Sequence, residues 1–226
     1  MRFAPNRNVG TFYPTAPIIT MDLATDTAMR AVFGDRSRLR NMCGIIASPS
    51  DDLYKAFQAC EDGDTIVLLP GLYDANTTIE ITKRISVLGV GAVVRGSGVL
   101  FDIQANDAQV HGVGFERTDR AAVLTSSSAV LVSGDGVAVY DCTFSTPGQR
   151  GLQIDGSYCS AQGNKFLPNA ARQAGDSDVY FEDGAIWGTA TGNIWSRTPG
   201  AFVIDYRWVD NITESANGNA GIVNIR

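Results

Sequence analysis

Hydrophobic residues in this chain alternate with polar ones in short runs, and two kinds of run recur at intervals of 22 to 29 residues. The first kind ends in an aromatic residue, and its four copies end at Phe115, Phe144, Phe166 and Trp195. The second kind has apolar residues two apart and falls between those copies, at 130–132, 152–154, 179–181 and 202–204. Alternation with a period of two predicts β-strands, and two strands in each repeat of this length predict a solenoid.

In a parallel solenoid each strand bonds to the strands of the coils above and below, so inward residues stack in columns. The repeat predicts two apolar columns, made of Phe115, Phe144, Phe166 and Trp195 in one and of Ile103, Val132, Ile154, Phe181 and Ile204 in the other. A polar column consists of Cys142, Asn164, Asn193 and Asn211 at equivalent turns. Asparagine tolerates left-handed backbone and can bond to the asparagine of the next coil, so we interpret this column as architecture.

The first 47 residues do not carry the repeat. Prolines at positions 5, 14 and 17 block both helix and central strand, which predicts an extended arm. Residues 22–33 show a weak helical stripe. We therefore predict two parts. Residues 1–47 form an extended arm and a short helix for anchoring or oligomer contacts, and residues 48–226 form the solenoid domain.

The clearest helix signal lies at 48–60. Ser48 is a candidate N-cap, and Pro49 suits the first turn, where no backbone N–H is required. Four residues at helical spacing then form one apolar face: Leu53, Ala56, Phe57 and Cys60. This face is predicted to cover the open end of the solenoid core.

The run at 56–74 adds a family resemblance. Its sequence, AFQACEDGDTIVLLPGLYD, resembles the entry into the parallel β-helix of the pectin-lyase-like superfamily, where an alanine-rich helix precedes Gly-Asp-Thr-Ile, a short strand and Pro-Gly-x-Tyr. The resemblance implies an all-β solenoid, namely a right-handed single-stranded parallel β-helix of about six to seven coils with an N-terminal capping helix. That superfamily holds polysaccharide lyases, glycoside hydrolases, epimerases, phage tailspikes and non-catalytic structural proteins, so the resemblance indicates a fold rather than an activity.

Charge is divided unevenly along the chain. The net charge is −6, but residues 1–47 carry six arginines against three aspartates, which leaves −9 on the remainder. An acidic body argues against nucleic acid. The basic start could bind an acidic partner or its own acidic body, and the sequence leaves both open. No apolar run is long enough for a membrane span, and the first residues lack the apolar segment of a secretory signal, so we expect synthesis in the cytoplasm without a membrane partner.

The cysteines do not form a metal motif. None of Cys43, Cys60, Cys142 and Cys159 stands in a CxxC pair, and the single histidine is His111. We expect no metal site and no cofactor, and we interpret the cysteines as reduced, buried thiols. His111 is expected to be a surface residue rather than a catalytic base.

Three carboxylates are the candidates for chemistry. Asp155, Glu182 and Asp205 each follow an inward apolar residue by one position, so they are expected to face outward on successive coils about 5 Å apart. Carboxylates at such separations serve glycosidases, and three of them could also hold a hard cation such as Ca²⁺. The alternative, which we favour, is that they point into water beside basic residues. The motifs of polygalacturonase-like enzymes are absent, so no catalytic residue is carried over from the family.

Partner contacts are expected in two regions. The arm offers basic and aromatic candidates, namely Arg2, Phe3, Arg7, Phe12, Tyr13, Arg36, Arg38 and Arg40. Two longer coils carry insertions at 116–128 and 167–177, where the candidates are Arg117, Arg120 and Arg172. The last strand, at 221–226, is not followed by a polar cap, so we expect association as a homo-oligomer, with a trimer favoured.

Two functions are consistent with these patterns. The first is a non-catalytic structural or binding protein of a virus particle, either a bacteriophage capsid decoration (cement) protein or a tail-associated protein that docks through its arm on a larger assembly such as a capsid. Its expected location is the virion. The second is a small carbohydrate-active β-helix, a tailspike-like glycosidase or polysaccharide lyase, with Asp155, Glu182 and Asp205 as its site. A glycan is thus a candidate ligand, and we rank the structural role first.

Overall fold

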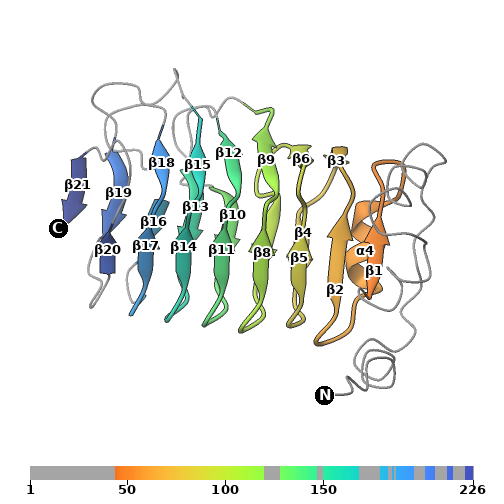
Figure 1. The fold of residues 1–226 in the computed structure, drawn as a ribbon, viewed down its shortest axis with the longest axis horizontal. Coiled ribbons are helices and arrows are strands. Elements are labelled where there is room, and N and C mark those ends of the chain that lie inside the picture. The colour runs from red at the N-terminus through yellow and green to blue at the C-terminus, as the bar shows by residue number, and fades with distance from the viewer. Residues whose placement is uncertain are drawn as a thin grey trace, which may run out of the picture.

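Parallel β-strands dominate the computed structural model of this chain (Figure 1). The structure describes residues 44–119, 128–146, 150–167, 179–182, 185, 187–195, 202–206, 213–215 and 222–225, and from residue 194 onward it describes the backbone alone. The chain passes in turn through three sheets, and one such passage is called a coil below. Each described strand pairs in parallel with the equivalent strand of the next coil. This arrangement is consistent with the predicted β-helix solenoid.

Within the described residues the three sheets contain eight, seven and six strands. The eight-stranded sheet consists, in spatial order, of β1 (Ile45–Ala47), β2 (Thr65–Leu68), β5 (Ser86–Leu88), β8 (Gln109–His111), β11 (Ala138–Tyr140), β14 (Ser160–Gln162), β17 (Thr189–Thr191) and β20 (Thr213–Ser215). The seven-stranded sheet consists of β4 (Ile79–Ile81), β7 (Phe101–Ile103), β10 (Ser128–Val132), β13 (Arg150–Ile154), β16 (Val179–Phe181), β19 (Phe202–Tyr206) and β21 (Ile222–Ile225). The six-stranded sheet consists of β3 (Gly71–Ala75), β6 (Ala92–Gly96), β9 (Gly114–Arg117), β12 (Thr143–Ser145), β15 (Lys165–Phe166) and β18 (Ile194–Trp195).

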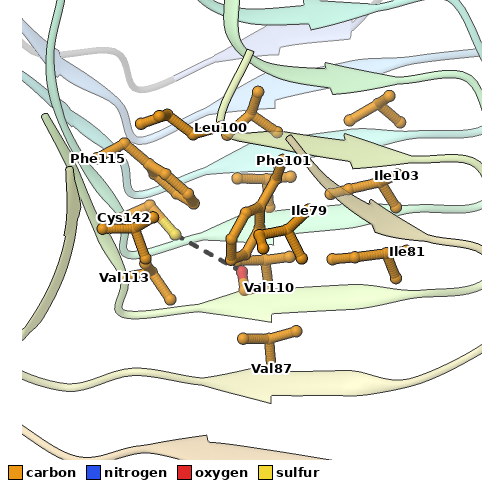
Figure 2. Packing of buried hydrophobic residues seen from close by; sticks show 14 of the residues in the cluster. Ile79, Ile81, Val87, Leu100, Phe101, Ile103, Val110, Val113, Phe115 and Cys142 are labelled. Carbon is orange, nitrogen blue, oxygen red and sulfur yellow. Dashed lines mark hydrogen bonds between the residues drawn. The ribbon is translucent and has the colours of Figure 1, made fainter. Parts of the chain in front are cut away.

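The core lies between the sheets, and aromatic rings stack through it. The ring centroids of Phe115 and Phe144 are 5.2 Å apart and those of Phe144 and Phe166 are 4.9 Å apart, while Trp195 follows in backbone register. Phe101, from the seven-stranded sheet, meets Phe115 edge-on at 5.1 Å (Figure 2). The predicted aromatic column is confirmed, and such contacts add to the stabilisation from burial of the rings.

The second predicted column is right for four coils and wrong for the fifth. Ile103, Val132, Ile154 and Phe181 are in register, but the residue opposite Phe181 is Tyr206, and Ile204 lies opposite Val179. The strand β19 has apolar or aromatic residues at 202, 204 and 206. Because a shift by two residues keeps the same side chains on the same face, this pattern fits either register.

The asparagine column forms the predicted ladder where the structure describes it. The Asn164 side-chain oxygen accepts from the Cys142 backbone N–H at 3.0 Å, and the Asn193 side-chain oxygen accepts from the Asn164 backbone N–H at 2.9 Å. The Asn164 amide group also donates to the Val139 carbonyl at 2.9 Å. Asn164 and Asn193 are fully buried, and Asn211 lies outside the described residues. The ladder satisfies buried backbone groups at turns where the strands cannot.

The helix α4 (Leu53–Gln58) is shorter than predicted and starts later. Its N-cap is Asp52, which accepts from the Lys55 backbone N–H, so the prediction of Ser48 as N-cap is wrong. Ser48 is instead buried, and both its backbone N–H and its hydroxyl group donate to Asp51. The apolar face of α4 packs inward, and Phe57 meets the core ring of Phe101 at 5.2 Å.

Candidate functional site

The outer face of the seven-stranded sheet carries the acidic residues singled out from the sequence. Asp155 follows β13 and Glu182 follows β16, and these strands pair with Ile154 opposite Phe181. The two carboxylates therefore occupy the same place on neighbouring coils, as predicted. Two residues before Asp155 and Glu182 on the same strands, Gln153 lies opposite Tyr180. Arg150 is the first residue of β13.

The Gln153 amide group joins the two carboxylates. Its nitrogen donates to Asp155 Oδ1 at 3.0 Å and to Glu182 Oε2 at 3.2 Å. Because both oxygens bond to one nitrogen atom, they are at most about 6.2 Å apart. The Tyr180 hydroxyl group is 3.4 Å from the other Glu182 oxygen, a long contact that adds little.

A cation lies over the aromatic ring of this face. The Arg150 guanidinium carbon is 3.6 Å from the centre of the Tyr180 ring, and Arg150 also donates to the Gln153 side-chain oxygen at 3.1 Å. The ring of Tyr180 is thus covered by a residue of its own chain. Gln153, Arg150 and Tyr180 were not among the predicted site residues, although Gln153 and Tyr180 stand at outward positions of the alternating strands.

The environment of Asp155 disfavours its charged form. Burial is the largest cause that raises the pKa of Asp155, and the charges of Glu182 and Asp102 act in the same direction. The hydrogen bond from Gln153 and the charge of Arg150 act in the opposite direction. Asp102 itself has one buried oxygen, Oδ1, without a hydrogen-bond partner among the described residues, while Gln104 donates to its other oxygen at 2.7 Å. A raised pKa of Asp155 is a shift in the direction that a general acid requires.

The third predicted carboxylate does not join this pair. Asp205 lies opposite Tyr180, two positions before the place that would continue Asp155 and Glu182. The prediction of three carboxylates in one row is therefore wrong, for the same reason that Ile204 was misplaced. Among the described residues no group of three or more His, Cys, Asp or Glu side chains could hold a metal ion.

Other candidate residues have ordinary structural roles. His111 is paired with Asp141 at 3.1 Å and stacks on the Tyr140 ring at 4.6 Å, on the outer face of the eight-stranded sheet. Three cysteines, Cys60, Cys142 and Cys159, are buried free thiols, while Cys43 lies outside the described residues. No helix in the described part of the chain is long and apolar enough to cross a membrane.

The insertion residue Arg117 is not a surface residue. Its side chain is 1% exposed and forms an ion pair with Asp119 two residues later, so its charge is used inside its own coil. The alternation of β9 indicates this direction, because Arg117 stands two residues after the inward Phe115 and so lies on the same face of the strand. The other predicted partner residues lie outside the described residues, namely Arg2, Phe3, Arg7, Phe12, Tyr13, Arg36, Arg38, Arg40, Arg120 and Arg172.

Comparison with known proteins does not add a function to this geometry. No protein-family model matches the chain, and no curated protein matches it either. The functional argument therefore rests on the side chains just described.

Proposed function

We propose that this chain is a non-catalytic structural and binding protein of a virus particle, a bacteriophage capsid decoration (cement) or tail-associated protein that docks through its N-terminal arm. In this proposal it is a member of the pectin-lyase-like superfamily, built as a right-handed β-helix of about six to seven coils, with α4 closing the N-terminal end of the core.

The observation that supports a non-catalytic role is the bridge formed by Gln153. A retaining glycosidase keeps its two carboxyl groups about 5 to 5.5 Å apart and acts on a sugar placed between them. Here the separation is of that order, but the amide group of Gln153 bonds to both Asp155 and Glu182. Arg150 in turn lies on Tyr180 and bonds to Gln153. These groups satisfy one another, which suits a rigid outer surface better than a reaction centre.

The division of charge supports docking through the arm. Residues 1–47 carry +3 and the remainder carries −9, so the two parts of the chain present opposite charge to a partner. Charged surfaces of this kind steer association and select partners. The arm also brings Phe3, Phe12 and Tyr13, and aromatic residues are frequent anchors in interfaces.

The experiment that tests this proposal measures the mass of the chain and its binding to capsids. Light scattering of the chain with and without residues 1–20 is followed by co-sedimentation with purified bacteriophage capsids. We expect the full-length chain to form an oligomer and to bind capsids, and we expect the loss of residues 1–20 to abolish capsid binding. A matched control removes exposed positive charge outside the arm, with Lys55→Glu and Arg84→Glu, and should leave binding intact. A full-length chain that does not bind capsids would contradict the proposal.

A second function, carbohydrate cleavage, is favoured by one observation. Asp155 has a raised pKa and lies within about 6.2 Å of the Glu182 carboxylate, which resembles an acid paired with a nucleophile. A panel of polysaccharides tests it with the intact chain and with Asp155→Asn and Glu182→Gln. Cleavage that disappears in both variants would establish the enzyme and replace our first proposal, whereas cleavage that survives would exclude this site.

A further inference from the structure

Two aromatic side chains are exposed at the corner where the chain passes from the seven-stranded to the eight-stranded sheet. Tyr158, two residues before β14, is 63% exposed, and Trp187, two residues before β17, is 53% exposed. Because β14 and β17 pair with Ser160 opposite Thr189, these residues hold the same place on neighbouring coils. Their backbones are thus one strand spacing apart, about 4.8 Å.

Both residues have a backbone conformation that bulky side chains avoid. The φ angles are 60° at Tyr158 and 58° at Trp187, in the left-handed region. On the two preceding coils the same place is held by Asp107 and Gly136, with φ angles of 57° and 68°. Aspartate and glycine accept this conformation more readily than aromatic residues do. The turn therefore requires left-handed backbone, but it does not require or favour an aromatic ring.

Carboxylates stand on the turns that carry the two rings and on the equivalent turns of the preceding coils, where Asp135 accepts from the Ser157 backbone N–H at 2.8 Å. Asp107 and Asp135 belong to the preceding coils, while Asp155 and Glu182 stand at the other end of the turns that carry Tyr158 and Trp187. The described residues of these four turns, within 104–108, 133–137, 155–159 and 182–188, include no lysine or arginine. We call Tyr158, Trp187, Asp107 and Asp135 the acidic-aromatic corner.

Exposed aromatic faces beside carboxylates are the groups that recognise a guanidinium cation. The ring attracts the cation over its face, and a carboxylate accepts charge-assisted hydrogen bonds from the same group. The chain uses this chemistry internally, since Arg150 lies 3.6 Å from the centre of the Tyr180 ring. A partner segment that carries arginine side chains therefore fits the acidic-aromatic corner, because its guanidinium groups can bind both the aromatic rings and the carboxylates.

The chain contains such a segment. Residues 35–41 read Asp-Arg-Ser-Arg-Leu-Arg-Asn, with arginine at positions 36, 38 and 40. In an extended chain alternate side chains point to the same side, so one face of this segment would present all three guanidinium groups.

The same chain can reach its own corner with only part of this segment. Arg40 is five residues before Ile45 in β1, which allows at most about 18 Å of extended chain. Along the eight-stranded sheet, β14 and β17 are the fifth and sixth strands after β1, or about 24 and 29 Å away. In one chain the backbone of Arg40 therefore falls short of both rings, although Arg36 and Arg38 lie far enough from Ile45 to reach them. A second copy is free of this limit and can place all three arginines against Tyr158 and Trp187.

We propose that the acidic-aromatic corner binds residues 35–41 of a second copy of this chain. Arg36, Arg38 and Arg40 then contact the rings of Tyr158 and Trp187 and the neighbouring carboxylates. This contact goes beyond the proposed function, because it joins copies of the chain to one another and assigns Arg36, Arg38 and Arg40 of the arm to that contact. The capsid contact is tested separately by removing residues 1–20, which do not include this segment. The two strained aromatic residues are retained at a cost to the fold because the interface needs them.

The test uses the full-length chain and three variants, with light scattering as a function of concentration and thermal unfolding as readouts. The corner variant carries Tyr158→Asn and Trp187→Asn, since asparagine accepts left-handed backbone. The segment variant carries Arg36→Glu, Arg38→Glu and Arg40→Glu. The control, Tyr54→Gln, removes an exposed aromatic residue on α4. We expect the corner and segment variants to be monomers, the control to assemble like the parent, and the corner variant to keep or raise its melting temperature.

A peptide of residues 35–41 provides a measurement that does not depend on the folding of a variant. Added to the parent chain, it should dissociate the oligomer, and the same peptide with glutamate for arginine should not. The inference is overturned if the parent chain is a monomer at every concentration, if the corner variant assembles like the parent, or if both peptides act alike. Capsid co-sedimentation separates this result from the proposed function, because a monomer that binds capsids refutes only the contact between copies.

Discussion

The buried asparagine ladder allows one contact to be removed with a predictable cost. In the variant Asn164→Ala the Cys142 backbone N–H loses its acceptor and the Val139 carbonyl loses a donor, in a place that is closed to water. An orphaned buried group costs about 1 to 3 kcal/mol and a lost hydrogen bond about 1 kcal/mol. With the small void left by the amide, we expect the free energy of unfolding to fall by about 3 kcal/mol.

An exposed copy of the same contact supplies the control. The Asn106 side-chain oxygen accepts from the Asp135 backbone N–H at 2.9 Å, again between neighbouring coils, but at the surface. Water can replace this acceptor, so Asn106→Ala should cost less than about 1 kcal/mol. Urea unfolding of the parent and both variants at 25 °C, followed by circular dichroism, gives the comparison. Equal losses of unfolding free energy in the two variants would mean that burial does not raise the cost of removing the acceptor.

Aspartate at the same position turns the contact into a pH-dependent one. The Asn164 amide nitrogen donates to the Val139 carbonyl and, at 3.1 Å, to the Asn193 side-chain oxygen, and both partners are acceptors. In Asn164→Asp only a protonated carboxyl group could donate to either, and burial also disfavours the charge, so the folded-state pKa of this aspartate rises above its unfolded value. Its stability is then highest below the unfolded pKa and is lost as pH rises. Urea midpoints at pH 4 and pH 7 should therefore differ in Asn164→Asp more than in the parent.

Two further predictions concern the ion pair of the buried Arg117 and the buried thiols. Arg117→Ala should lower the free energy of unfolding by about 2 kcal/mol, because it leaves a void at a fully buried side chain and removes its ion pair with the partly exposed Asp119. Arg95→Ala breaks the more exposed pair with Glu116 and should cost less than about 1 kcal/mol. Equal losses in urea unfolding would refute the burial argument. Burial raises the pKa of Cys60 and Cys142 to about 12 and that of Cys159 to about 11, so these thiols should react with a disulfide reagent at pH 8 only as fast as the chain unfolds. The folded-state pKa values of these thiols lie above the unfolded ones, so their contribution to stability is complete below pH of about 8.5. Above that pH the free energy of unfolding should fall by at most about 1.4 kcal/mol per thiol and pH unit. Urea midpoints at pH 8 and pH 10 measure this fall.

Much of the fold follows from patterns that repeat with the coil. The column of Phe115, Phe144 and Phe166 and the ladder of Asn164 and Asn193 were predictable, because residues in equal register on stacked coils must meet. The pairing of Asp155 with Glu182 followed from the same rule.

The remaining features depend on local geometry that the repeat does not specify. A strand with apolar or aromatic residues at 202, 204 and 206 fits two registers, and Asp205 was misplaced for that reason. Ser48 satisfies the sequence preferences of an N-cap, yet the chain turns into the helix only at Asp52. The bridge by Gln153 depends on side-chain conformations that the repeat does not specify. The left-handed backbone of Tyr158 is indicated only by Asp107 and Gly136 at the equivalent positions of earlier coils, because an aromatic residue by itself does not favour it.

The unequal length of the coils has a consequence for how this chain can change. Between β7 and β10 the equivalent residues Ile103 and Val132 are 29 positions apart, whereas Val132 and Ile154 on the next coil are 22 apart, and both pairs remain in register. Seven residues thus enter or leave at a corner without altering the stack beneath it, and the entropy cost of a longer loop grows only slowly with its length. Insertion and deletion at these corners are therefore nearly neutral for the fold. A lineage, or a protein engineer, can add a new peptide at such a corner while the rest of the molecule is left as it is.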